Sequence, residues 1–270
     1  MTKVFESTQK KLEYVLVDPD NQQQIADALE KEKAGFGKGI DPVEVPEVLE
    51  FIARNGHVWL QYAFEQKRNP TGVIELIPLK KALEFDPCKI VTEADLSVSP
   101  LNIITRGTND VFQHARRFAD DGYITYHHGI SMSRRGEGYG TLLLNYALGN
   151  TPNLKDKVVV CPIDAAKIVN GKLMPAANKS SYTIHMKAGF VLAGVVEPPV
   201  YDDTITYYSV VRPRDSMPLK FVRQNENVKF DEPIVATTIQ QIRDLTSQGY
   251  VGVSYNRKSH EMVFRKIGRK

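Results

Sequence analysis

Three alternating glycines and two adjacent arginines lie together near the middle of the chain, in the sequence RRGEGYG at residues 134–140. Glycine has no Cβ, so a turn made mostly of glycine lets the main chain approach a ligand closely. The leucine-rich run from Thr141 to Leu148 predicts a helix, and the free N–H groups and positive dipole at the start of a helix bind anions. The segment therefore predicts a site for a phosphate-bearing ligand, held by main-chain amides and by Arg134 and Arg135.

Other glycine loops are distinguished by their spacing. A Walker loop is excluded because Gly140 is followed by Thr141 with no lysine. A Rossmann turn needs G-x-G-x-x-G after a strand buried on both faces, whereas the strand expected at 125–130 carries two histidines. Asp164 lies roughly where a ribose-binding acid would be, about 20 residues on, so this reading stays open. A glycine turn without any ligand is the remaining alternative.

A third pattern, Arg/Gln-x-x-Gly-x-Gly/Ala, is met by Arg135 to Gly140, and here the chain resembles the GNAT superfamily of N-acetyltransferases. A second landmark, NKSSYTIHMKAGF at 178–190, resembles the helix and Gly-Phe exit that follow in that family. The resemblance covers residues 12–213. It implies an N-acetyltransferase that uses acetyl-CoA (coenzyme A) as cosubstrate and no metal, and a loop whose amides bind the pyrophosphate.

The resemblance also implies which residues bind the cofactor. They lie at the end of the strand, in the loop and at the starts of two helices: Ile130, Ser131, Met132, Arg134, Arg135, Gly136, Glu137, Gly138, Tyr139, Gly140, Thr141, Asn178 and Ser181. Glu137 should face solvent, because a carboxylate turned inward would repel phosphate. A Gly138→Asp substitution should abolish cofactor binding by filling space and by placing a buried negative charge in the loop.

Acetyl transfer to an amine needs a deprotonated amine, a polarised thioester carbonyl and a protonated leaving thiolate. In the family a backbone N–H of the fourth strand, here within 129–132, polarises the carbonyl. The thiolate acid is commonly a tyrosine four residues before the Gly of Gly-Phe, a position held here by His185. An imidazolium can supply that proton near neutrality, and Tyr182 on the same helix face is the substitute. The alternative for His185 is a helix histidine packed against the sheet.

Two histidines on the predicted strand at 125–130 raise the question of the proton acceptor. His127 and His128 point to opposite faces unless a β-bulge intervenes, so at most one reaches the acceptor. We take His128 as the candidate. No clustered Cys/His spacing predicts zinc.

The elements that position these residues follow from hydrophobic periodicity. The loop is preceded by a strand (12–17), a helix (21–32, ended by glycines 35, 37 and 39), a helix beginning at Pro46 and a hairpin (57–64 and 73–79). After the loop helix, which Gly149 should end, come a strand (157–163), the second landmark and two strands (191–196 and 204–211). The expected fold is α+β (α/β) of the GNAT type: a central mixed, mostly antiparallel sheet flanked by helices.

Domain organisation is predicted as a GNAT domain at 1–213 and a small α+β extension at 214–270. The domain carries two insertions, at 80–121 with a helix at 109–119, and at 164–177 with a turn at 170–171. The extension contains a strand (219–223), a helix (237–247) and a hairpin (250–255 and 261–267). Such a unit packs on a neighbour or pairs two subunits, so a homodimer is one expected assembly.

Composition bounds the class of protein. The 270 residues are 42% hydrophobic and 25% charged, which excludes a disordered chain, and a net charge of +3 does not argue for nucleic acid. Cys88 and Cys161 make no disulfide framework. The first residues lack an apolar signal segment and no run matches a membrane span. We expect a soluble, cytoplasmic protein without a nucleic-acid or membrane partner.

The acceptor is expected to be an amine on a small molecule or peptide, and no acidic cluster specifies it further. Two other functions use the same loop. The donor could be a longer acyl-CoA or an acyl carrier protein, with the insertions shaping its pocket. The chain could also be a non-catalytic CoA-binding module, as the missing tyrosine suggests.

Overall fold

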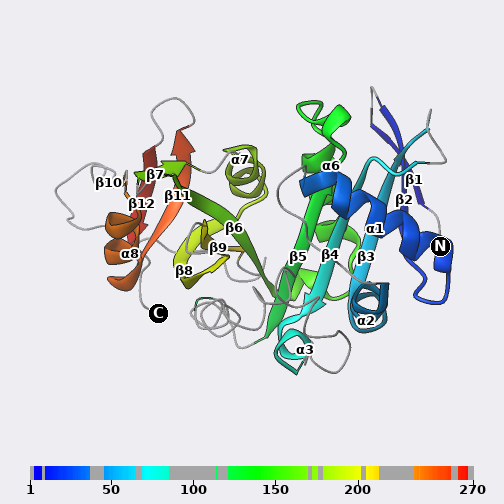
Figure 1. The fold of residues 1–270 in the computed structure, drawn as a ribbon, viewed down its shortest axis with the longest axis horizontal. Coiled ribbons are helices and arrows are strands. Elements are labelled where there is room, and N and C mark those ends of the chain that lie inside the picture. The colour runs from blue at the N-terminus through cyan, green and yellow to red at the C-terminus, as the bar shows by residue number, and fades with distance from the viewer. Residues whose placement is uncertain are drawn as a thin grey trace. The chain divides into compact units, whose positions relative to one another are not determined.

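The computed structural model describes residues 3–7, 10–36, 46–64, 69–84, 114, 121–169, 172–175, 179–201, 205–212, 234–236, 238–256 and 261–266. The chain forms two compact units (Figure 1). The first comprises Met1–Thr108 and Tyr123–Leu154, and the second Asn109–Gly122 and Lys155–Lys270. The predicted domain boundary at 213 lies outside the described residues and stays a prediction.

The first unit is built on a sheet in the order β1-β2-β3-β4-β5, with every neighbouring pair antiparallel. Its strands are β1 (Lys3–Ser7), β2 (Lys10–Leu16), β3 (His57–Ala63), β4 (Gly72–Pro78) and β5 (Gly122–Ile130). Strand β4 is buried from Gly72 to Ile77 because helices pack on both of its faces. This explains its nearly continuous apolar sequence, GVIELIP.

Helices cover both faces of this sheet. On one face lie α1 (Gln22–Phe36) and α2 (Pro46–Asn55), drawn in front of the strands in Figure 1, and Tyr62 Oη donates to Asp27 of α1 at 3.2 Å. On the other face lies α6 (Tyr139–Asn150), where Trp59 Nε1 donates to Thr151 Oγ1 at 3.0 Å. A short helix, α3 (Leu79–Glu84), follows β4. Different helices thus cover the two faces of the sheet, and α6 with its preceding loop lies on the face opposite α1 and α2.

The second unit has a sheet in the order β7-β6-β9-β8-β11-β12-β10, again with antiparallel neighbours. Its elements are β6 (Val158–Val169), β7 (Lys172–Pro175), α7 (Lys179–Lys187), β8 (Val191–Tyr201), β9 (Ile205–Arg212), β10 (Ile234–Ala236), α8 (Ile239–Ser247), β11 (Tyr250–Asn256) and β12 (Glu261–Lys266). Gly252 of β11 pairs with Leu192 of β8, so the C-terminal extension continues the sheet.

The predicted fold class is confirmed: a mostly antiparallel sheet flanked by helices, with a C-terminal α+β extension. The helix and strand types predicted for the described segments are also confirmed. The insertion predicted at 164–177 stays a prediction; within it, β6 runs on to Val169 and pairs with β7, on either side of the turn predicted at 170–171. The predicted helix ends are wrong at two glycines: α1 passes through Gly35, and α6 passes through Gly149. A glycine near the last turn of a helix costs little, so tertiary packing outweighs it.

Among the described elements, β1, α3 and β10 were not predicted, nor were the 3-10 helices at Met132–Arg134 and Leu154–Asp156; all of them are short. The predicted strand at 219–223 lies outside the described residues. So does nearly all of the predicted helix at 109–119, of which His114 alone is described, in helical conformation.

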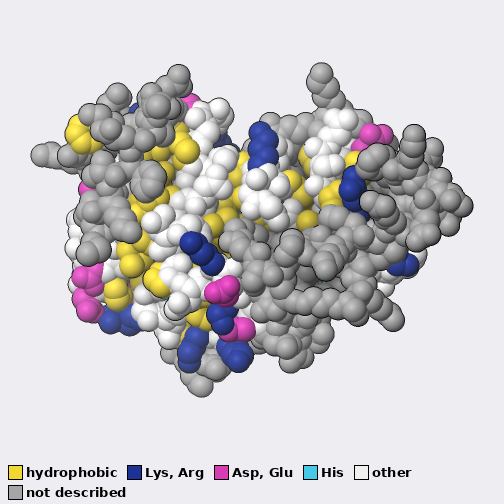
Figure 2. All heavy atoms as spheres, turned by 180° about the vertical axis from the view of Figure 1, so that it is seen from behind, with side chains coloured by type: hydrophobic (Ala, Val, Ile, Leu, Met, Phe, Trp, Pro, Cys, Tyr) yellow, Lys and Arg dark blue, Asp and Glu magenta, His cyan; other side chains and the backbone are white. Residues whose placement is uncertain are grey.

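The described helices include none with the length and apolar character needed to cross a membrane. Figure 2 shows one face of the molecule, where the coloured Lys and Arg side chains are interspersed with Asp, Glu and neutral residues. No broad area of a single charge sign is present among the coloured atoms of that face.

Candidate anion-binding site

The glycine segment forms a tight loop between β5 and α6. After Ser131 the chain makes a 3-10 turn (Met132–Arg134), and Gly136 and Gly138 then both adopt φ 86°. This left-handed conformation suits glycine because a Cβ would crowd the following carbonyl. A Cβ placed on either glycine would meet no heavy atom of the described residues within 4 Å. The two glycines therefore turn the main chain while leaving open space above it.

Helix α6 begins without a side-chain cap. Its N-cap is Gly138 (φ 86°, ψ 0°), and no side-chain hydrogen bond is made there. Helix α8 shows the usual arrangement: Thr238 Oγ1 accepts from Gln241 N at 3.2 Å, and the Gln241 side chain returns to Thr238 N. The start of α6 thus has no side-chain cap at Gly138, and the helix dipole favours an anion there.

Arg134 is held beside this helix start. Its Nη1 lies 3.7 Å from Glu137 Oε2, three residues on, and its Cζ lies 5.9 Å from the centroid of the Tyr139 ring. The Glu137 side chain is 39% exposed, as predicted from its charge. Arg135 is exposed. The loop therefore carries its own carboxylate, which holds the Arg134 guanidinium near the open amides.

A β-bulge lies just before His128. Ile74 pairs with His128 and Leu76 pairs with Thr125, so two residues of β5 oppose the single residue Glu75. Paired residues share a face, so the bulge leaves His128 on the α6 side. Its Nε2 lies 3.1 Å from Gly140 O, and because a carbonyl only accepts, that nitrogen donates. His128 therefore ties β5 to the first turn of α6.

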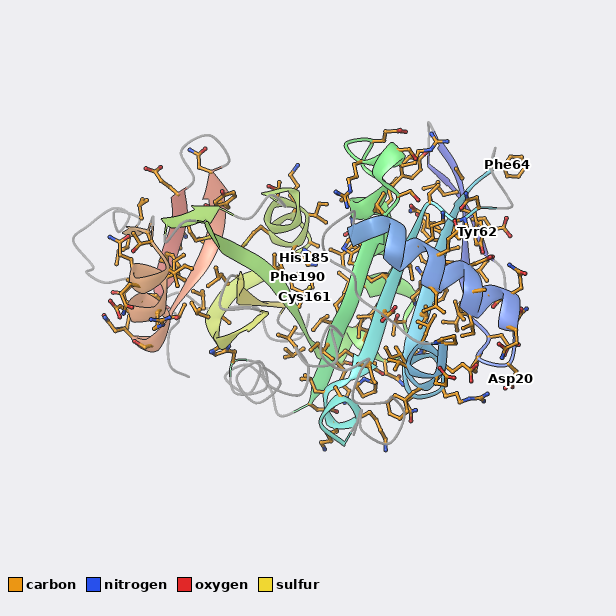
Figure 3. The ribbon with its side chains drawn as sticks, in the orientation of Figure 1. Asp20, Tyr62, Phe64, Cys161, His185 and Phe190 are labelled. Atoms are coloured by element: carbon orange, nitrogen blue, oxygen red, sulfur yellow. The ribbon has the colours of Figure 1, made fainter. Side chains whose placement is uncertain are left out.

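His185 is packed into the second unit rather than exposed. It is 1% exposed, and its ring meets Phe190 edge to face at 5.0 Å between centroids; Figure 3 labels the two rings next to one another. Phe190 N donates to His185 O at 3.0 Å, Gly189 N donates to Met186 O at 3.1 Å, and Gly189 has φ 87°. This is a Schellman cap, in which contact between these two side chains is a usual component.

The described part of the first unit contains only part of the predicted site. The loop residues from Arg134 to Thr141 and His128 lie around the start of α6 in the first unit. Asn178 lies outside the described residues. Tyr182 and Ser181 fall in α7, but their side chains lie outside the described part, as do those of Met132 and His127.

Three buried polar residues on or beside β3 and β4 were not singled out from the sequence. Gln61 and Glu75 are both 0% exposed, and Thr71 is 1% exposed. Gln61 and Thr71 hydrogen bond to the loop, as described below. Glu75 lies opposite the bulge, and its register places it on the face covered by α1 and α2. The sequence does show these polar residues within otherwise apolar strands. Hydrophobic periodicity, however, does not predict which groups they contact.

Two alternatives are tested by this geometry. The Rossmann reading is wrong, since β5 runs antiparallel to β4 and a Rossmann turn needs a parallel sheet. Among the described residues no group of three or more His, Cys, Asp or Glu is placed to hold a metal ion.

No family model matches the chain, and no curated protein does. Solved structures similar in fold include the ribosomal-protein-S18-alanine N-acetyltransferase from Escherichia coli, at 9% identity and TM-score 0.46, covering 81% of this chain and 99% of that one. The NatC complex bound to Gag peptide and CoA matches at 12% identity and TM-score 0.45, covering 75% and 98%. A protein from Desulfovibrio desulfuricans assigned to the GNAT family matches at 10% identity and TM-score 0.44, covering 75% and 98%.

Proposed function

We propose that the protein is an acyltransferase that moves an acetyl group from acetyl-CoA to an amine, directly and within a ternary complex. The observation that carries the proposal is the uncapped start of α6, with two left-handed glycines whose open side could admit a diphosphate. Arg134, 24% exposed and already beside the loop, would add a charge-assisted hydrogen bond.

The residues present fit coenzyme A. The amides at the start of α6 would hold the pyrophosphate, and Arg134 and Arg135 would neutralise it. The bound thioester supplies an activated acetyl carbon: the amine nitrogen bonds to it, the carbon–sulfur bond breaks, and the thiol leaves with a proton. Ser131 N donates to Thr71 O at 3.0 Å, so this amide is already engaged. The carbonyl-polarising role predicted for 129–132 therefore falls to a neighbouring amide.

Proton transfer is assigned by burial and contact. His185 is engaged in the cap of α7, so we assign its ring a packing role and keep Tyr182 as the thiolate acid. His128 Nε2 donates to Gly140 O, which leaves only Nδ1 to accept a proton. Glu75 is a second candidate acceptor, on the other face beside the bulge. Glu75→Gln and His128→Gln, compared in an assay of CoA release, separate these two.

Two other functions share the loop, as the sequence already indicated. A longer acyl donor or an acyl carrier protein would use the same amides, and thermal shift with acetyl-CoA, longer acyl-CoAs and free CoA distinguishes the donors. A non-catalytic module would bind CoA and release none from acetyl-CoA with any amine of a panel. A small-molecule or peptide amine remains the proposed acceptor, and a homodimer the proposed assembly.

Titration calorimetry of the full chain with CoA tests the proposal. We expect one site with a dissociation constant in the micromolar range, weakening with added salt because part of the attraction is ionic. Absence of heat with CoA and with acetyl-CoA would refute it. A structure with bound CoA would then show what occupies the acceptor side.

A further inference from the structure

Two fully buried polar side chains lie directly beneath the loop. Gln61 is in the middle of the sheet on β3, and Thr71 immediately precedes β4; they are 0% and 1% exposed. Polar groups buried to this degree are stable only when hydrogen bonded. Their bonds lead to the two ends of the glycine loop.

Thr71 fixes the orientation of the Gln61 amide. Thr71 Oγ1 lies 3.1 Å from Gln61 Oε1 and 3.0 Å from Gln61 O, while Thr71 N donates to the same Gln61 O at 2.6 Å. The carbonyl Tyr139 O can only accept, so the amide nitrogen of Gln61 is directed toward it and the amide oxygen faces the Thr71 hydroxyl. The two residues thus form one unit with a single amide orientation.

The amide nitrogen reaches the far end of the loop. Gln61 Nε2 donates to Tyr139 O at 3.3 Å and to Tyr14 Oη at 3.2 Å. The amide N–H only donates, so the Tyr14 oxygen accepts this bond, and burial raises the pKa of the Tyr14 phenol, which keeps its own proton. The Tyr14 ring stacks on Tyr146 of α6 at 3.8 Å between centroids. Both amide hydrogens of Gln61 are therefore used on the α6 side of the sheet.

The near end of the loop is bound by the same pair. Ser131 N donates to Thr71 O at 3.0 Å. Gly72 lets the strands approach, because a Cβ there would lie 2.9 Å from Gly129 O and 2.4 Å from Ile130 Cδ1. Ser131 and Tyr139 flank residues 132–138, so one buried Gln–Thr pair contacts the main chain on both sides of the loop.

We infer that Gln61 and Thr71 are positioning residues for the loop. The series of hydrogen bonds that links Ser131, Thr71, Gln61 and Tyr139 sets the separation of the loop's two ends and so aligns the loop amides for a diphosphate. This inference rests on the proposed function. A merely structural pair would stabilise the fold and leave the relative affinity for different ligands unchanged. A positioning pair governs affinity for the diphosphate part of the ligand in particular.

Thr71→Val tests the inference, because valine has the shape of threonine and no hydroxyl. Calorimetry compares CoA with pantetheine, which lacks the diphosphate. We expect Thr71→Val and Gln61→Met each to weaken CoA binding about tenfold, as one lost hydrogen bond of the aligned set would. Pantetheine affinity should stay within about twofold, and Thr71→Ser should restore CoA binding.

Thr246→Val is the matched control. Thr246 is 6% exposed, and its Oγ1 donates to Arg243 O at 3.1 Å within α8, so this variant loses an equivalent buried hydroxyl elsewhere. It should bind CoA as the wild type does. If Thr71→Val does not fold, Thr71→Ser and Gln61→Met still decide the question, with thermal midpoints measured alongside.

The outcomes separate the two proposals. If the wild type does not bind CoA, the proposed function fails, and the positioning role fails with it. If the wild type binds CoA and Thr71→Val and Gln61→Met bind it equally well, the positioning role alone is overturned. Equal weakening for CoA and pantetheine also overturns it, since that result indicates a structural pair.

Discussion

Gly138 and Gly189 have the same backbone conformation at opposite ends of two helices. Their φ angles are 86° and 87°, and a Cβ on either would meet no heavy atom within 4 Å. Gly138 begins α6 in the first unit, where no side chain caps the helix. Gly189 ends α7 in the second unit, where Gly189 N and Phe190 N donate to carbonyls of the last turn. Gly138 thus stands at a helix start without a side-chain cap, whereas the cap at Gly189 satisfies carbonyl acceptors.

The comparison separates a binding motif from a capping motif. Both glycines belong to segments that resemble landmarks of one family, yet Gly138 lies at a helix start and Gly189 at a helix end. At a helix start the free groups are N–H donors that attract anions, whereas a left-handed glycine at a helix end closes the helix. The same distinction applies to the neighbouring side chains: Arg134 stands beside open amides, and His185 packs within a closed cap.

The largest expected effect comes from placing a carboxylate at the open glycine. Gly138 is exposed, so the expectation of a buried charge is wrong; an aspartate there would repel the ligand and occupy its space. We expect Gly138→Asp to weaken CoA binding at least about 100-fold, as loss of several charge-assisted bonds would. Calorimetry measures the loss.

Gly249→Asp is the control for that variant. Gly249 also has φ 87°, and a Cβ there would meet no heavy atom within 4 Å, but this glycine follows the end of α8. Each substitution should lower the free energy of unfolding by about 1–2 kcal/mol, the cost of a left-handed non-glycine residue. Only Gly138→Asp should lose CoA. Equal CoA affinity in the two variants would remove Gly138 from the site.

The next effect concerns His185 and is one of stability. We expect His185→Ala to lower the free energy of unfolding by about 2–3 kcal/mol, because it empties a fully buried position. His185→Phe keeps an aromatic ring against Phe190 and should cost less than about 1.5 kcal/mol. Urea unfolding measures both, and CoA affinity should not change in either. A folded His185→Phe that binds CoA but has lost turnover would instead support the acid role predicted from the sequence.

A smaller effect is expected from the ion pair within the loop. Glu137 holds Arg134 and also opposes the ligand's charge, so Glu137→Gln should strengthen CoA binding by about two- to fivefold at low salt. Arg134→Gln should weaken it. The difference in CoA affinity between Glu137→Gln and the wild type should shrink at high salt. If the difference persists at high salt, or if Glu137→Gln binds CoA more weakly at low salt, Glu137 supports the loop rather than competing with the ligand.

The sequence predicted the loop well and its supports poorly. Glycine spacing and adjacent arginines are local signals, so the loop and α6 could be placed from them. The bonds from Gln61 to Tyr139 span 78 positions, and no pattern in β3 distinguishes a glutamine that anchors a loop from one at the surface. The position of His128 depends on a bulge opposite Glu75, which alternation cannot predict. His185 shows the converse: the resemblance suggested chemistry, and the three-dimensional contact with Phe190 shows packing.

The smallest expected effect concerns His57 of the first unit, a histidine that is only partly buried, whereas His185 is fully buried. Burial lowers the pKa of His57 below its usual value of 6.5, and its Nδ1 has no hydrogen-bond partner among the described residues. As the pH falls through about 6.5, the unfolded chain therefore binds a proton at His57 that the folded chain does not. The contribution of His57 to the free energy of unfolding is thus fully present above that pH and is lost as the pH falls. His57→Gln removes this proton difference. Urea unfolding at pH 7.5 and 5.5 should therefore show a larger decrease in the free energy of unfolding on acidification for the wild type than for His57→Gln. Equal decreases would mean that His57 titrates alike in the folded and the unfolded chain.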